Sequence, residues 1–123
     1  MRKISTFQDL KVWQKSHQLT LQIYKITEKF PKIEIYGLAN QIRRAAVSVA
    51  SNIVEGFERR GTKDGLHFYN IADGSLEEVK YQLLLAKDLD YINGESYEEV
   101  VNLAEEVSKM LNSWIKSQLK ILK

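Results

Sequence analysis

Residues 41–85 read QIRRAAVSVASNIVEGFERRGTKDGLHFYNIADGSLEEVKYQLLL, and this stretch decides the fold. Its first half is rich in small side chains, namely Ala45, Ala46, Ser48, Ala50, Ser51 and Gly56. We expect two long helices joined by a tight turn. Small side chains let two helix backbones approach closely, so we expect the first of these helices to lie at the centre of a bundle. Between them, Gly61 is expected to end the first helix in a left-handed conformation, and Thr62 to cap the second.

Apolar residues elsewhere in the chain also recur in steps of three and four, the spacing of helices that face a core. The predicted helices span residues 10–29, 37–58, 63–90 and 96–121. The stripes expected to be buried run from Val12 to Phe30, Leu38 to Phe57, Tyr69 to Ala86 and Tyr97 to Gln118. The sequence therefore predicts an all-α protein, an antiparallel up-down four-helix bundle in which residues 1–123 form a single domain.

Composition narrows the class of protein. A chain of 123 residues with 44% hydrophobic and 28% charged residues suits one globular domain. The absence of cysteine excludes disulfides and thiolate metal sites and fits a reducing cytoplasm, the expected location. The start lacks the apolar run of a signal peptide, and no apolar run approaches the roughly 20 residues of a membrane span, so no membrane partner is expected.

Charge is unevenly placed along the chain. Residues 1–61 hold 11 Lys or Arg against 5 Asp or Glu, whereas residues 62–123 hold 7 against 11. A basic half can bind nucleic acid. It can equally pair with the acidic half, within one chain or between subunits, so the sequence leaves both interpretations open.

Sequence motifs for catalysis or metal binding are absent. Paired Glu-x-x-His motifs would indicate a two-metal bundle, but only Asp64-x-x-His67 comes near that pattern, and it occurs once. No phosphate loop, dinucleotide fingerprint or nucleophile elbow is found. We therefore expect no metal, no cofactor and no enzymatic activity. A site built between subunits is the alternative that the sequence leaves open.

Two groups of side chains are not needed to form the core of a monomeric bundle. Aromatic residues stand beside the buried stripes, notably Trp13, Tyr24, Phe68 and Tyr81. A polar ridge follows one face of the second helix and consists of Arg44, Ser48, Asn52, Glu55 and Arg59. We expect the aromatic residues, with Ser48, Asn52 and Glu55, to form an oligomer interface or a structural polar ridge. A groove for a nucleic-acid backbone is the alternative for the ridge.

The stretch QIRRAAVSVASNIVEGF, followed by Arg59-Arg60, resembles the 23S rRNA intervening-sequence protein family of bacterial four-helix bundles. The resemblance extends over nearly the whole chain. It includes Phe7-x-x-Leu10-x-Val12-Trp13-Gln14-Lys15, Phe30-Pro31 with Tyr36-Gly37-Leu38, and His67-Phe68 with Gly74-Ser75-Leu76-x-Glu78. Ala50 departs from the proline expected in many members, which implies a straighter second helix here.

The resemblance implies a ring-like homo-oligomer, commonly a pentamer. It also implies kinship with the accessory variability protein of diversity-generating retroelements, and hence RNA or DNA and a reverse transcriptase as possible partners. We expect an oligomeric, non-enzymatic accessory protein that binds nucleic-acid phosphates. The residues expected to make these contacts are Lys11, Lys15, Arg43, Arg44, Arg59 and Arg60. The alternative is a protein scaffold that forms the ring and has no nucleic-acid role.

Overall fold

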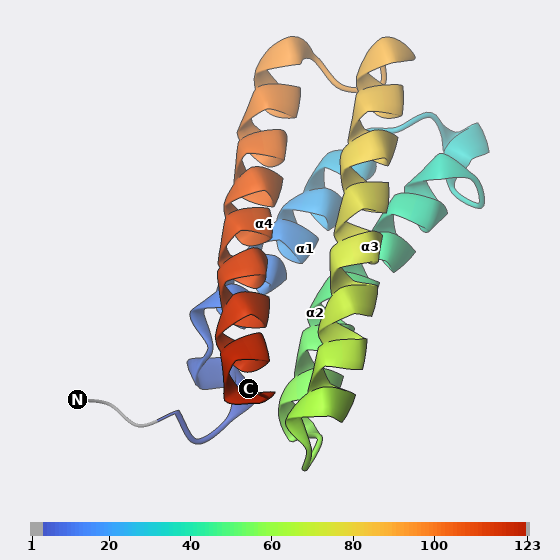
Figure 1. Cartoon of the computed structure of the whole chain (residues 1–123). Helices are drawn as coiled ribbons and strands as arrows, with labels where there is room; N and C mark the ends of the chain where they lie inside the picture. Colours follow the sequence, from blue (N-terminus) through green and yellow to red (C-terminus); the bar gives the residue numbers. More distant parts are fainter. Residues whose placement is uncertain (1–3, 123) are drawn as a thin grey trace.

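The computed structural model describes residues 4–122 and shows four long α-helices that pack side by side (Figure 1). They are α1 (Lys11–Thr27), α2 (Leu38–Glu58), α3 (Thr62–Asp88) and α4 (Gly94–Leu122), with short 3-10 helices η1 (Phe7–Asp9) and η2 (Lys32–Glu34) before α1 and α2. Successive helices run in opposite directions, so the start of α1, the α2–α3 turn and the end of α4 lie at one end. The predicted all-α, up-down four-helix bundle is confirmed.

The core lies where the periodicity places it. Leu19, Ile23, Ile42, Val49 and Leu83 have no exposed surface, and the remaining stripe residues are buried or half-buried. Each helix contacts both of its neighbours in the ring α1–α2–α3–α4. Burial of these apolar faces is the main contribution to helix stability, because isolated helices are marginal in water. α1 and α3 each end two residues earlier than expected, and α4 begins two residues earlier.

The closest approach of backbones is between α2 and α3, and the small residues of α2 permit it. A Cβ atom built at Gly65 would lie 2.9 Å from the carbonyl oxygen of Gly56. One built at Gly56 would lie 2.9 Å from the carbonyl oxygen of Gly65 and 2.8 Å from the Cδ1 atom of Tyr69. Both distances are shorter than ordinary contacts, so these two glycines set the spacing of the helices.

The left-handed residue lies at the end of α3, and the expectation for Gly61 is wrong. Gly61 has φ −100° and ψ 141°, an extended conformation that places it as the N-cap of α3, with Thr62 already helical. Asp90 has φ 63°. Its N–H donates to the carbonyl of Lys87 and that of Tyr91 to Ala86, a pair of bonds that closes the helix C-terminus as a Schellman motif. Arg59 is extended, so α2 needs no left-handed residue to end.

The end of the bundle that holds the α1–α2 and α3–α4 connections is closed by one carboxylate. Glu34 accepts a hydrogen bond from the backbone N–H of Leu38 at 3.0 Å and another from the hydroxyl of Tyr91 at 2.7 Å. The first bond satisfies a free donor at the start of α2, and the second joins two connections that are far apart in sequence. The Tyr91 ring also lies 5.4 Å from that of Phe30. We call this set of contacts the Glu34 strap.

Candidate nucleic-acid interface

The polar ridge of α2 bonds mainly to its own chain. The hydroxyls of Ser48 and Ser75 are 2.8 Å apart, and the amide nitrogen of Asn52 donates to the carbonyl and hydroxyl oxygens of Ser48. Glu55 pairs with Arg59 at 2.9 Å, one helical turn away. Ser48 and Asn52 thus belong to a polar seam between α2 and α3, which the residue spacing alone did not distinguish from an interface between subunits.

The arginines that bracket α2 are in different surroundings. The Arg43 guanidinium donates to the Thr27 hydroxyl and the Tyr24 carbonyl and lies 4.7 Å from the centre of the Tyr24 ring. The Arg59 guanidinium lies 4.4 Å from the ring centre of Phe68. Both therefore have partners within the chain. Arg44 and Arg60 are exposed and make no hydrogen bond or ion pair with another described residue.

The two lysines of α1 also differ. Lys15 forms an ion pair with Glu106 of α4 at 3.1 Å, which is a contact between the basic and acidic halves within one chain. Lys11 is exposed and has no hydrogen bond or ion pair among residues 4–122. Within the acidic half, Lys80 of α3 lies 3.2 Å from both Glu77 of the same helix and Glu105 of α4. Burial alone would lower the pKa of Lys80, but these two carboxylates raise it above its usual value.

Folding turns the charge asymmetry along the sequence into an asymmetry along the bundle axis. We define the basic end as residues 4–18, 52–74 and 109–122, which lie together in the up-down topology. It carries eight Lys or Arg and five Asp or Glu, whereas the other described residues carry seven and eleven. Six cations of the basic end are exposed without a described partner: Lys11, Arg60, Lys63, Lys109, Lys116 and Lys120. Three of them lie on α4, in the half of the chain that the sequence marks as acidic.

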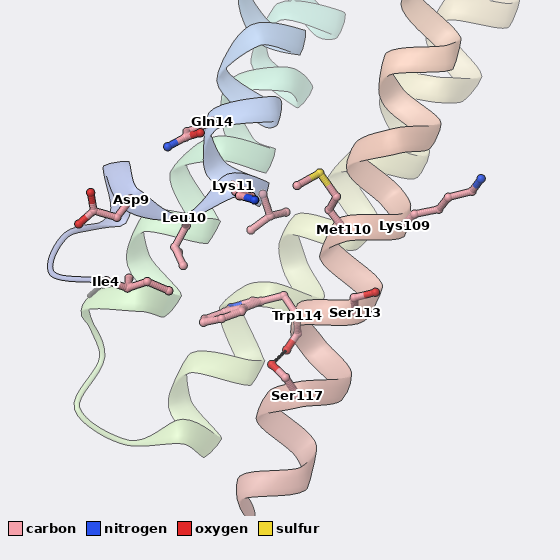
Figure 2. A pocket seen from close by; sticks show the side chains of 11 residues that line it. Ile4, Asp9, Leu10, Lys11, Gln14, Lys109, Met110, Ser113, Trp114 and Ser117 are labelled. Carbon is pink, nitrogen blue, oxygen red and sulfur yellow. Dashed lines mark hydrogen bonds between the residues drawn. The ribbon is translucent and has the colours of Figure 1, made fainter. Parts of the chain in front are cut away.

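Two recesses open at the basic end. The larger is a groove of about 840 Å³ between the N-terminal segment and α4. Its lining residues are Ile4, Asp9, Leu10, Lys11, Val12, Gln14, Lys109, Met110, Ser113, Trp114 and Ser117. Figure 2 shows Trp114 reaching from α4 towards Ile4 and Leu10, while Lys109 points outward from the rim. The smaller recess, about 180 Å³, lies beside the α2–α3 turn and includes Arg59 and Arg60.

Trp114 lines both recesses. Sequence periodicity assigned it to the buried stripe of α4, yet its side chain is only partly buried. The indole meets the Tyr69 ring edge-on, with the ring centres 6.0 Å apart. Burial raises the pKa of Tyr69. The indole nitrogen of Trp114 is itself buried and makes no hydrogen bond with any described residue. The sequence signal for this site was a tryptophan near the end of a helix that also carries Lys109, Lys116 and Lys120.

A third recess, of about 320 Å³, lies between α1 and α2 and is largely apolar. Trp13 and His17 line it from α1 and stack with ring centres 5.0 Å apart, while Val47 and Val54 line it from α2. Leu21 and Tyr24 are exposed on α1, with 58% and 41% of their surface accessible. We call these six residues the α1–α2 apolar surface. On α3, Tyr81 is exposed with 62% of its surface accessible, and Leu84, three residues later, is exposed as well.

No group of three or more His, Cys, Asp or Glu within residues 4–122 is placed to hold a metal ion. His67 meets the Phe68 ring edge-on. In the same part of the chain, no helix combines the length and the apolar character needed to cross a membrane.

Comparison with known proteins agrees with the fold. The model of the 23S rRNA-intervening sequence protein family matches residues 8–113. A protein of unknown function from the S23 ribosomal protein family of Bacteroides thetaiotaomicron, whose crystal structure was solved at 1.70 Å, is similar with a TM-score of 0.77. The two chains are 30% identical, and the similarity covers 85% of this chain and 98% of the other. No curated protein matches the chain.

Proposed function

The chain belongs to the 23S rRNA-intervening sequence protein family, and from this premise we propose that it is a non-enzymatic accessory protein that binds nucleic acid through phosphate contacts at its basic end. The observation that carries the proposal is the set of six exposed, unpaired cations gathered at that end. Phosphate contacts by Lys and Arg supply most of the sequence-independent affinity for nucleic acid.

The geometry favours the basic end over the faces of α1 and α2 that the sequence suggested. Lys15, Arg43 and Arg59 each have a partner in the chain, so a phosphate would have to compete for them. Lys11 and Arg60 have no described partner, and both lie at the basic end. The acidic residues concentrate at the far end, where they would repel a phosphate backbone and so orient it towards the cations.

Charge reversal tests the proposal. We expect the pair Lys11→Glu and Arg60→Glu to weaken binding of a short single-stranded RNA by tenfold or more at low salt. The slope of log K against log salt should become shallower by about 0.7 for each phosphate that the variant no longer neutralises. The matched control is the pair Lys25→Glu and Lys29→Glu, two exposed lysines at the other end of α1 and just beyond it, which should have much less effect. Equal weakening by both pairs would contradict the proposal.

Self-association is the second candidate property, and the α1–α2 apolar surface favours it. Exposed apolar side chains that are contiguous often mark protein interfaces. The ring-like homo-oligomer, the pentamer and the reverse transcriptase partner remain predictions from the family resemblance. Light scattering of Leu21→Glu and Val47→Glu tests the surface. We expect both variants to lower the mass of the assembly, and an unchanged mass would remove this surface from consideration.

The polar ridge makes a competing prediction for assembly. If Arg44 and Glu55 close a ring between subunits, then Arg44→Glu or Glu55→Lys should dissociate it. The bond between Glu55 and Arg59 within α2 favours the apolar surface instead. Measuring all four variants together decides between the two surfaces.

A further inference from the structure

We propose that Trp114 is a stacking platform for an unpaired base of single-stranded nucleic acid, with the flanking phosphates held by Lys11 on one side and Arg60 on the other. This inference rests on the proposed function and assigns it a specific ligand class. It starts from the position of Trp114, which forms the wall between the large groove and the small recess.

The indole is packed on its inner side and borders the groove on its outer side. Its inner side contacts Tyr69 edge-on, and the Ser117 hydroxyl donates to the backbone carbonyl oxygen of Trp114 at 2.6 Å on the same helix. The outer part of the side chain faces the groove, across from Ile4 and Leu10 (Figure 2). A stacked base gains affinity from the aromatic face, and every base has such a face, so the contact tolerates any sequence.

The groove has the size and chemistry for a base. Its volume of about 840 Å³ is within the range of small-ligand sites. Leu10, Val12 and Met110 give it an apolar floor, while Gln14 and Ser113 supply an amide and a hydroxyl at its walls. A base in a duplex is already stacked on both sides, so an open groove with one aromatic wall suits a single strand.

The charges beside Trp114 suit a backbone that passes over it. Lys11 lines the groove, Arg60 lines the small recess, and both are exposed without a described partner. Among the described residues, Asp9 is the one carboxylate that lines the groove, and it already accepts hydrogen bonds from the backbone N–H groups of Ser5 and Thr6. No carboxylate of residues 4–122 lines the small recess. Cations therefore flank the aromatic ring on both sides, as in proteins that bind single strands.

Trp13, the other tryptophan of the chain, makes a useful internal control. Its ring is already stacked on His17 with an interplanar angle of 7°, so one face is covered. It lies in the α1–α2 recess, which no described Lys or Arg lines. Trp114, by contrast, is partly exposed, lines the groove and has cations among its neighbouring lining residues.

The experiment uses the full chain carrying Trp13→Phe, so that emission at tryptophan wavelengths reports on Trp114. The ligands are an oligothymidylate of about ten nucleotides and an abasic strand with the same number of phosphates. We expect the oligothymidylate to quench the emission and to bind about tenfold more tightly than the abasic strand. Trp114→Leu should abolish this difference while leaving affinity for the abasic strand within about twofold. Trp114→Tyr, which keeps an aromatic face, should retain most of the difference in affinity between the two strands.

Failure of the inference and failure of the proposed function give different results. If both strands bind equally and the emission is unchanged, the basic end binds phosphates but Trp114 stacks no base, and the inference is wrong. If neither strand binds at low salt, the proposed function fails as well. Circular dichroism of Trp114→Leu and Trp114→Tyr shows whether each variant is folded, and the quenching experiment on Trp13→Phe needs no change at Trp114.

Discussion

The two ends of the bundle differ in how tightly their chain segments are joined. At the end of the Glu34 strap, the carboxylate of Glu34 bonds to the backbone of Leu38 and to the hydroxyl of Tyr91, so the two connections are joined to each other. At the basic end, the start of α1 and the last turns of α4 leave a groove and a small recess, and six cations have no described partner. Binding surfaces need unsatisfied polar groups and accessible apolar atoms, and the basic end combines these with open volume.

The largest expected effect contrasts two adjacent residues of α4. Leu111 is fully buried, whereas Met110 is half-buried at the groove. Leu111→Ala should lower the free energy of unfolding by about 3–4 kcal/mol because it leaves a cavity in the core. Met110→Ala should cost less than about 1 kcal/mol, since the groove is already open. Urea denaturation followed by circular dichroism measures both. Similar costs would mean that the groove is as closely packed as the core beside it.

The next test uses the glycines of α3. Gly65→Ala brings a methyl group to 2.9 Å from the Gly56 carbonyl oxygen, so the helices must move apart. We expect the free energy of unfolding to fall by about 2–3 kcal/mol. Gly74→Ala is the matched control on the same helix, because no described atom lies within 4 Å of the added methyl group. It should stabilise the protein by up to about 1 kcal/mol through helix propensity. A neutral Gly65→Ala would show that the α2–α3 contact yields easily.

These contrasts also show what the sequence could predict. Periodicity located the four helices and their buried stripes, because burial repeats every three or four residues along each helix. The small residues of α2 indicated a close approach to another helix, but they did not identify α3 as the partner. The sequence could not place the partners of Arg43 or Lys15, since Thr27 and Glu106 lie on other helices. The groove depends on where α1 begins relative to the end of α4, which periodicity within one helix does not report. The Glu34 strap joins residues 57 positions apart and has no local signal.

The Glu34 strap predicts a pH dependence with two limits. The backbone hydrogen bond from Leu38, followed by that from Tyr91, lowers the pKa of Glu34 below 4.5. A lowered pKa in the folded state stabilises the protein above the unfolded value, and this contribution disappears as the pH falls through the folded pKa. The hydrogen bond to Glu34 raises the pKa of Tyr91 above 10.0, so its contribution disappears as the pH rises through that higher value. The strap is therefore fully formed between about pH 5 and 10.

Glu34→Gln tests this window. The variant should melt a few degrees below the parent at pH 7, and the difference should shrink as the pH falls below the ordinary glutamate pKa of 4.5. Tyr91→Phe, the companion variant, removes the bond to Glu34 but leaves the bond to Leu38, so it should abolish the alkaline limit and only part of the acid one. Thermal melts from about pH 3 to pH 11.5 provide the measurement, because the alkaline limit lies above pH 10. Parallel melting curves for parent and Glu34→Gln at every pH would exclude the strap as a titrating element.

The smallest expected effect is at Asp90, beside the Glu34 strap. Its φ of 63° lies in the left-handed region, which costs a residue with a side chain more than it costs glycine. Asp90→Gly should therefore raise the free energy of unfolding by about 0.5 kcal/mol, the part of the strain that exceeds the greater entropy of glycine in the unfolded chain. Asp88→Gly, two residues earlier in the last helical turn, should instead destabilise the protein by a similar amount. If Asp88→Gly stabilised the protein and Asp90→Gly did not, contacts other than the left-handed residue would determine where α3 ends. Since neither position lies at the basic end, both variants should bind the oligothymidylate as the parent does, which separates the stability of the closed end from recognition at the open one.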